Sequence, residues 1–90
     1  MCRNIRTLFN FAPPATDGEI RAAALQFVRK IAGTRQPSKA NTKPFDVAVE
    51  RIFACSKRLL DDLVPTGPPK DREEEARKAK ERFRKRFSRP

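Results

Sequence analysis

Apolar residues recur at helical spacing in the first half of the chain. Between Thr16 and Gly33 they form one stripe, made of Ile20, Ala24, Phe27 and Ile31. Thr16 is followed three residues later by Glu19, which is the spacing of a capping box at a helix start. Gly33 suits the left-handed conformation that ends many helices. The pattern predicts a helix over residues 17–32 with one apolar stripe along it.

A second amphipathic stretch follows a polar loop that contains Pro37. Its apolar positions also recur at helical spacing, and they are Phe45, Val49, Ile52, Leu59 and Leu63. Asn41 is suited to cap this helix, and Pro44 is tolerated only in a first turn. We expect a helix over about residues 42–63 that pairs with the first helix in an antiparallel arrangement.

Shorter patterns stand at the two ends of the chain. Asn4 followed by Ile5, Leu8 and Phe9 predicts a short N-terminal helix, and the prolines after Ala12 require extended backbone. After the Pro-rich break over residues 64–69, the pattern predicts a third helix. That helix runs from an acidic start to a basic end, as the helix dipole favours, and its thin apolar stripe docks weakly through two phenylalanines, Phe83 and Phe87.

These elements predict an all-α fold. We expect a small helical core domain over residues 1–69, built on the antiparallel pair and braced by the short N-terminal helix. Residues 70–90 are expected to form a charged C-terminal helix. A chain of 90 residues buries only a modest core.

Composition removes several chemistries. The chain has no histidine, so it has no histidine base, no Ser–His–Asp triad and no histidine metal ligand. Two cysteines, Cys2 and Cys55, are too few for a structural zinc site. No apolar run reaches the length of a membrane span, and no long apolar stretch follows the first arginines as in a secretory signal. We therefore expect a cytoplasmic protein that is not an enzyme, binds no membrane and holds no metal or cofactor.

The formal net charge is +10, which favours acidic partners. Residues 70–90 hold 10 basic and 5 acidic side chains, so charge is densest there. Basic residues at the end of this segment are suited to grip phosphates, and they are Arg82, Arg84, Lys85, Arg86 and Arg89. The two neighbouring phenylalanines are suited to stack on bases. The alternative is a solvated helix that only obeys the dipole.

A second group of basic residues gathers around the predicted loop between the paired helices. It comprises Arg29, Lys30, Arg35, Lys39 and Lys43. Such a patch would suit an acidic protein surface, although each residue taken alone also suits an ordinary polar loop. Thiol chemistry at Cys2 is a remote alternative, since an exposed N-terminal cysteine beside Arg3 and Arg6 would have a nucleophilic thiolate.

The chain resembles a known family along most of its length. The segments MCRNIRTLFNF, APPAT, EIRAAALQFVRKIAG and PSKAN closely resemble an uncharacterised bacterial family of small domains of unknown function. This resemblance brings no established activity.

A weaker resemblance is to the J domain of heat-shock co-chaperones, which places a short helix and a turn before two antiparallel helices. The residues that match the turn are Ala15, Thr16, Glu19 and Ile20, and those that match the basic helix are Arg21, Arg29 and Lys30. In place of the His-Pro-Asp triplet, which is needed to stimulate the chaperone ATPase, this chain has Gln36-Pro37-Ser38, and Ala24 replaces the usual tyrosine. The resemblance implies a binding surface that includes Arg21 and a missing stimulatory activity.

Together these patterns predict a non-enzymatic module that binds an acidic protein partner. The residues expected to bind it are Arg21, Arg29, Lys30, Arg35 and Lys39. Nucleic-acid binding through the C-terminal helix is the chief alternative.

Overall fold

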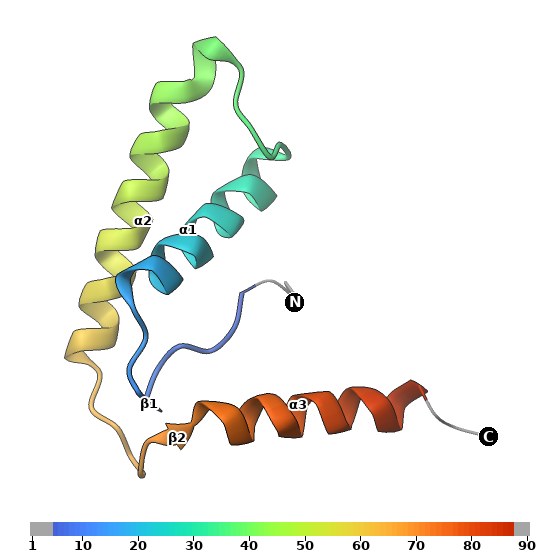
Figure 1. Ribbon diagram of the computed structural model, residues 1–90. Coiled ribbons are helices and arrows are strands. Elements are labelled where there is room, and N and C mark those ends of the chain that lie inside the picture. The colour runs from blue at the N-terminus through green and yellow to red at the C-terminus, as the bar shows by residue number, and fades with distance from the viewer. Residues whose placement is uncertain (1–4, 88–90) are drawn as a thin grey trace.

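The computed structural model describes residues 5–87 and shows a mostly helical protein (Figure 1). Within these residues there are three α-helices, one short 3₁₀ turn at Lys39–Asn41 and two strands of two residues each. The helices are α1 (Asp17–Ala32), α2 (Thr42–Asp62) and α3 (Arg72–Phe87), and the strands are β1 (Phe11–Ala12) and β2 (Lys70–Asp71). The strands pair in parallel, Phe11 with Lys70 and Ala12 with Asp71. The predicted helical fold class is confirmed.

Helix α1 begins and ends as its local sequence predicts. The Thr16 hydroxyl accepts a hydrogen bond from the Glu19 backbone N–H at 3.2 Å, and the Glu19 carboxylate accepts one from the Thr16 backbone N–H at 3.0 Å. This reciprocal pair is the capping box. At the other end, Gly33 has a φ of 72° and donates its N–H to the Arg29 carbonyl at 2.9 Å.

Helices α1 and α2 form an antiparallel hairpin whose core is small. Its buried residues are Ile20, Ala24, Val28, Phe45 and Val49. The apolar stripe predicted for α1 is buried only in its first half, because Phe27 is 44% exposed and Ile31 is 71% exposed. The row of α1 that meets α2 advances by four residues at each step and reaches Val28, which leaves the two larger side chains beside the contact.

Helix α2 also buries less of its apolar stripe than its periodicity predicts. Phe45 and Val49 face α1, whereas Leu59 is 55% exposed and Leu63 is 42% exposed. Asn41 occupies the capping position, but its side chain makes no capping hydrogen bond. Instead, the Thr42 hydroxyl donates to the Ser38 carbonyl at 3.1 Å.

The predicted N-terminal helix is wrong over the residues that the structure describes, and Asn4 lies outside them. Residues 5–10 are not helical and lead into β1. A helix of one or two turns gains little on its own, and the following prolines prevent its extension. The strand that follows, β1, pairs with β2, which lies about sixty residues away in sequence.

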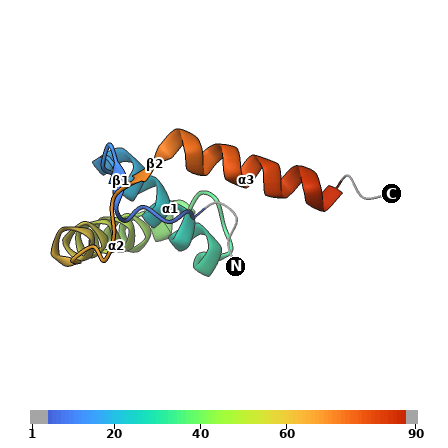
Figure 2. The same ribbon diagram turned by 90° about the horizontal axis from the view of Figure 1, so that it is seen from below.

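Helix α3 projects away from the helical hairpin, as Figures 1 and 2 both show. It starts two residues later than predicted because residues 70 and 71 form β2, and the Asp71 carboxylate caps it by accepting from the Glu74 N–H at 2.9 Å. The radius of gyration is 16.1 Å, against about 12 Å expected for a compact chain of this length. Phe83 is 62% exposed. No helix in residues 5–87 is long and apolar enough to cross a membrane.

Candidate functional site

An apolar groove opens between the C-terminal half of α1 and the N-terminal half of α2. Its volume is about 630 Å³, and the loop between the helices closes one end. We call it the α1–α2 groove and define it by Phe27, Ile31, Pro37, Ala48 and Ile52. Buried core residues from both helices form its floor. This size and lining are typical of binding sites.

The groove exists because α1 carries a wider apolar arc than α2 covers. The row that ends in Val28 contacts α2, and Phe27 and Ile31 stand on the neighbouring row at the side. On α2, Ala48 and Ile52 are half-buried against the core and complete the opposite wall. The apolar walls are therefore apolar positions of the two helices that the hairpin contact leaves uncovered.

Four of the five predicted partner-binding cations lie at the loop end of the hairpin. Arg29 is half-buried, and its Nε donates to the Arg35 carbonyl at 3.0 Å, which holds the loop against α1. Lys30, Arg35 and Lys39 are exposed, and none of them has an ion-pair partner within residues 5–87. Lys30 follows Phe27 by one helical turn, so a cation stands beside the α1–α2 groove.

The fifth predicted cation, Arg21, has a different environment. It forms an ion pair with Glu50 of α2, and its guanidinium carbon lies 4.2 Å from the centre of the Phe53 ring. These contacts join the two helices. Arg21 therefore acts in the hairpin contact, and its charge is already neutralised.

Arg51 is a cation that the sequence analysis left out. It is exposed on α2, one helical turn after Ala48, and it has no ion-pair partner in the described part of the chain. Arg51 follows Ala48 by three residues, and this spacing places the two on neighbouring positions of the helix surface. That spacing is the sequence signal that would have identified Arg51.

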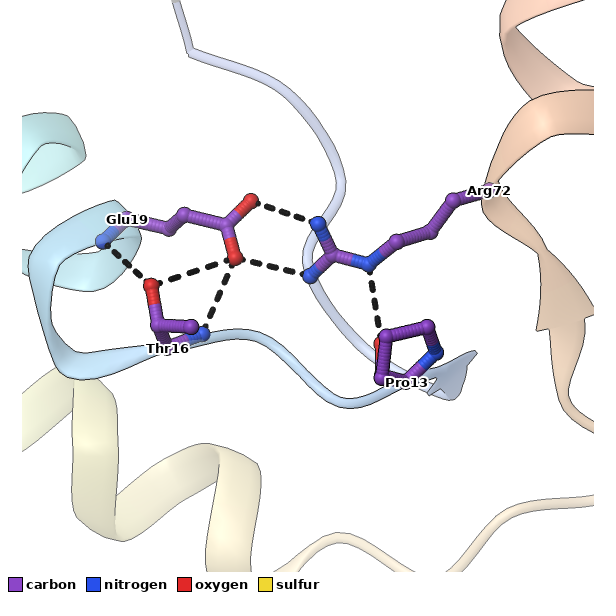
Figure 3. A network of polar contacts seen from close by, with 4 residues as sticks. All are labelled: Pro13, Thr16, Glu19 and Arg72. Atoms are coloured by element: carbon purple, nitrogen blue, oxygen red, sulfur yellow. Dashed lines mark hydrogen bonds and ion pairs between the residues drawn. The ribbon is translucent and has the colours of Figure 1, made fainter.

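A polar network joins the start of α3 to the start of α1 (Figure 3). The Arg72 guanidinium donates to the Glu19 carboxylate from Nη1 at 2.9 Å and from Nη2 at 2.8 Å, and its Nε donates to the Pro13 carbonyl at 2.8 Å. We call these contacts the α1–α3 junction. The hydrogen bonds from Arg72, followed by the one from the Thr16 backbone, lower the pKa of Glu19 to about 2. The same pairing raises the pKa of Arg72.

Asn10 supports the α1–α3 junction from the N-terminal segment. Its φ is 62°, in the left-handed region that asparagine tolerates. Its side-chain amide donates to the carbonyls of Gly67 and Pro68, both at 3.2 Å, and its own carbonyl accepts from the Lys70 N–H at 2.8 Å. The polar groups of the junction thus bond to one another, and they join the N-terminal segment and the start of α1 to the start of α3.

The cations of the alternative nucleic-acid site lie on the projecting half of α3. Arg82, Arg84, Lys85 and Arg86 are exposed, and none has an ion-pair partner in residues 5–87. Arg89 lies outside the described residues. The loop cations and the α3 cations therefore form two separate basic surfaces.

The thiol hypothesis concerns Cys2, which also lies outside the described residues. Cys55 is exposed and free. Within residues 5–87, no three cysteine or acidic side chains come together in a way that could hold a metal ion.

The fold and the groove define a small, mostly helical protein built on a hairpin with one uncovered apolar face. The chain belongs to the family described as uncharacterized conserved protein (DUF2277), which matches residues 1–78. The match includes the α1–α2 groove and both partners of the α1–α3 junction, and it ends before Arg82. No curated protein and no solved structure matches the chain.

These comparisons confirm the resemblance to a family of unknown function. They give no support to the weaker resemblance to J domains. The short helix that a J domain places before its helix pair is also absent from residues 5–10.

Proposed function

We propose that this protein is a non-enzymatic binding module that docks an acidic segment of a partner protein at the α1–α2 groove. The observation that carries the proposal is the position of Phe27 and Ile31, which are exposed on either side of Lys30 in sequence and line an open groove. A partner segment in this groove would touch apolar walls and a free cation together.

Each kind of residue has a distinct part in this proposal. Burial of Phe27 and Ile31 supplies most of the affinity, because each side chain still exposes a large apolar area. Lys30, Arg35 and Lys39 attract an acidic segment and reject a basic one. Arg29 holds the loop in place through its bond to the Arg35 carbonyl.

The chemistry of the chain supports binding rather than catalysis. There is no histidine, and Glu19 and Arg72 are bonded to one another at the α1–α3 junction. A carboxylate held ionised in this way is a poor proton donor or acceptor near neutral pH. The α1–α2 groove itself is lined mainly by apolar side chains.

The test is a binding measurement with the full chain and a fluorescent peptide. Leucines recur in this peptide at helical spacing, and glutamates occupy positions between them. We expect binding that weakens as salt is added and is lost in Lys30→Glu, which reverses the charge beside the groove. The matched control is Lys80→Glu, an exposed lysine on α3, which should bind as the wild type does. Equal loss in both variants, or no binding at low salt, would refute the proposal.

Nucleic-acid binding through α3 is a second candidate function. The observation that favours it is the projection of α3 away from the hairpin (Figure 2). The cations at the end of this helix are exposed, and they are Arg82, Arg84, Lys85 and Arg86. The family match ends at residue 78 and so includes the α1–α2 groove but not these cations. A function shared by the family would therefore reside in the groove. Random DNA and RNA at low salt test this candidate, since it requires steep salt dependence and loss of binding on deletion of residues 77–90.

A further inference from the structure

The uncovered apolar surface extends beyond the α1–α2 groove along α2. Four apolar residues are spaced by four, three and four positions, and they are Ala48, Ile52, Cys55 and Leu59. They fall within about 60° of the helix circumference and span about 17 Å. We call them the α2 strip. Its first half forms a wall of the groove, whereas Cys55 is exposed and Leu59 is 55% exposed.

The spacing of the α2 strip is that of a coiled-coil seam. A seam of this kind is covered by another helix, whose side chains fit between those of the first. A helix also satisfies its own backbone hydrogen bonds, so it can lie on an apolar strip without leaving polar groups unpaired. Helix α1 packs against the neighbouring row of α2, on Phe45 and Val49.

Building on the proposed function, we infer that the bound segment is an acidic amphipathic α-helix that lies along the α2 strip. One end of this helix enters the α1–α2 groove, between Phe27 and Ile52, and the rest extends toward Leu59. It completes a three-helix bundle with α1 and α2. Its apolar residues face the seam at heptad spacing.

The charges beside the seam specify the acidic character of the partner. Lys30 of α1 and Arg51 of α2 flank the groove end, and both are exposed without an ion-pair partner within residues 5–87. At the other end, Arg58 already pairs with Asp62 at 3.1 Å. The carboxylates of the partner are therefore expected to cluster near the groove end of its helix.

The same charges argue against a second copy of this chain as the occupant. The net charge of the chain is +10, and its other amphipathic helix, α3, carries more basic than acidic side chains. Placing α3 of another copy on the α2 strip would bring cations against Lys30 and Arg51. In this structure α3 is itself held at the α1–α3 junction and projects away from the helical hairpin (Figure 1).

The native thiol of Cys55 allows the position of the bound helix to be tested. The experiment uses the full chain with Cys2→Ser, so that Cys55 is the remaining thiol. The probe is an acidic three-heptad peptide with leucine at the seam positions and a bromoacetyl group on one central seam-flanking residue. Binding is followed by fluorescence anisotropy, and cross-linking to Cys55 is followed by mass spectrometry. A peptide with the same composition but broken heptad spacing is the matched probe.

We expect the heptad peptide to cross-link Cys55 at least about tenfold faster than the peptide with broken heptad spacing, here called the scrambled peptide. Leu59→Glu should weaken binding at least about tenfold, because a buried leucine would be replaced by a charge. The matched control pair is Val47→Gln with Leu59→Gln, since Val47 is 38% exposed, lies about 120° around α2 from Leu59, and a neutral side chain there leaves the charge of Arg51, one helical turn away, unchanged. Binding by Val47→Gln should equal that of the wild type, whereas Leu59→Gln should weaken it.

The possible failures separate this inference from the proposed function. Binding of both peptides with equal, slow labelling of Cys55 would overturn the helical arrangement on the α2 strip and leave the acidic groove site standing. Absence of binding by either peptide would overturn both. A dimer in sedimentation at the concentration used, with Cys55 protected before peptide is added, would assign the strip to a second copy and overturn the inference.

Discussion

Arg72 and Glu19, which lie 53 positions apart, are joined by two parallel hydrogen bonds of 2.9 and 2.8 Å. The same Glu19 carboxylate accepts the Thr16 N–H of the capping box at 3.0 Å. One side chain therefore stabilises the first turn of α1 and also holds the start of α3. A bidentate pair of this kind fixes orientation as well as distance.

The geometry of the Arg72 guanidinium predicts that Arg72→Lys loosens α3. Lysine keeps the charge, but it lacks the planar fork that reaches both Glu19 oxygens and the Pro13 carbonyl. We expect the NMR order parameters of the α3 amides to fall while those of α1 stay unchanged. Arg77→Lys, on the same helix and without an ion-pair partner in residues 5–87, is the control. Rigid α3 amides in Arg72→Lys would contradict this account of the α1–α3 junction.

The lowered pKa of Glu19 predicts a stability contribution that depends on pH. Its pKa falls from 4.5 to about 2 in the folded chain, so the unfolded chain takes up the proton first on acidification. The contribution is fully present above about pH 4.5 and is lost as the pH falls to about 2. Glutamine preserves the capping position without the charge. The difference in unfolding free energy between wild type and Glu19→Gln should therefore narrow over this interval, and a constant difference would argue against the assignment.

The burial of Val28 predicts a clear contrast with its neighbour on α1. Val28 is 7% exposed and Ile31 is 71% exposed, although it is Ile31 that belongs to the apolar stripe read from the sequence. Val28→Ala should lower the free energy of unfolding by about 2 kcal/mol, through lost apolar burial and a cavity. Ile31→Ala should change it by less than about 0.5 kcal/mol. Urea titrations of the two variants measure this contrast, and equal losses would place Ile31 in the core.

The different environments of Arg21 and Lys30 predict opposite effects on stability and on binding. Arg21→Ala removes the contacts with Glu50 and Phe53, and it should lower stability by up to about 1 kcal/mol at unchanged peptide affinity. Lys30→Ala should leave stability unchanged and weaken binding of the acidic peptide. Thermal unfolding and anisotropy on the same two samples separate these roles. A loss of affinity in Arg21→Ala would restore that residue to the binding surface.

Local signals were sufficient to predict the helical hairpin. The capping box at Thr16 and the left-handed Gly33 are read from neighbouring residues, and both are present in the structure. The α1–α3 junction was missed because it joins Arg72 to Glu19 across most of the chain, and no local pattern reports such a contact. The predicted N-terminal helix was wrong over residues 5–10, which lead into the pairing of residues 11 and 12 with residues 70 and 71, another contact that no local pattern reports.

Two residues of the α1–α2 groove already stand out in the sequence, as members of the apolar stripe of the first helix. Phe27 and Ile31 belong to the predicted apolar stripe, and helical periodicity shows where an apolar arc lies, but not how much of it a neighbouring helix covers. The loop cations were found by their proximity in sequence. Arg21 was included on the strength of the J-domain resemblance, and its pairing with Glu50 became visible only in the fold.

The thinness of the molecule makes its stability sensitive to any ligand that binds the folded state. The Cα atoms extend 49 × 39 × 17 Å, and within residues 5–87 even Ala24, the most buried core residue, keeps 2% of its surface exposed. A ligand that binds only the folded state raises the unfolding temperature as its concentration increases. We therefore expect the melting temperature to rise with added acidic heptad peptide and to stay constant with the scrambled one. In a cell, the same linkage would make the abundance of this protein follow the supply of the partner proposed above, because an unbound chain unfolds more often and is degraded sooner.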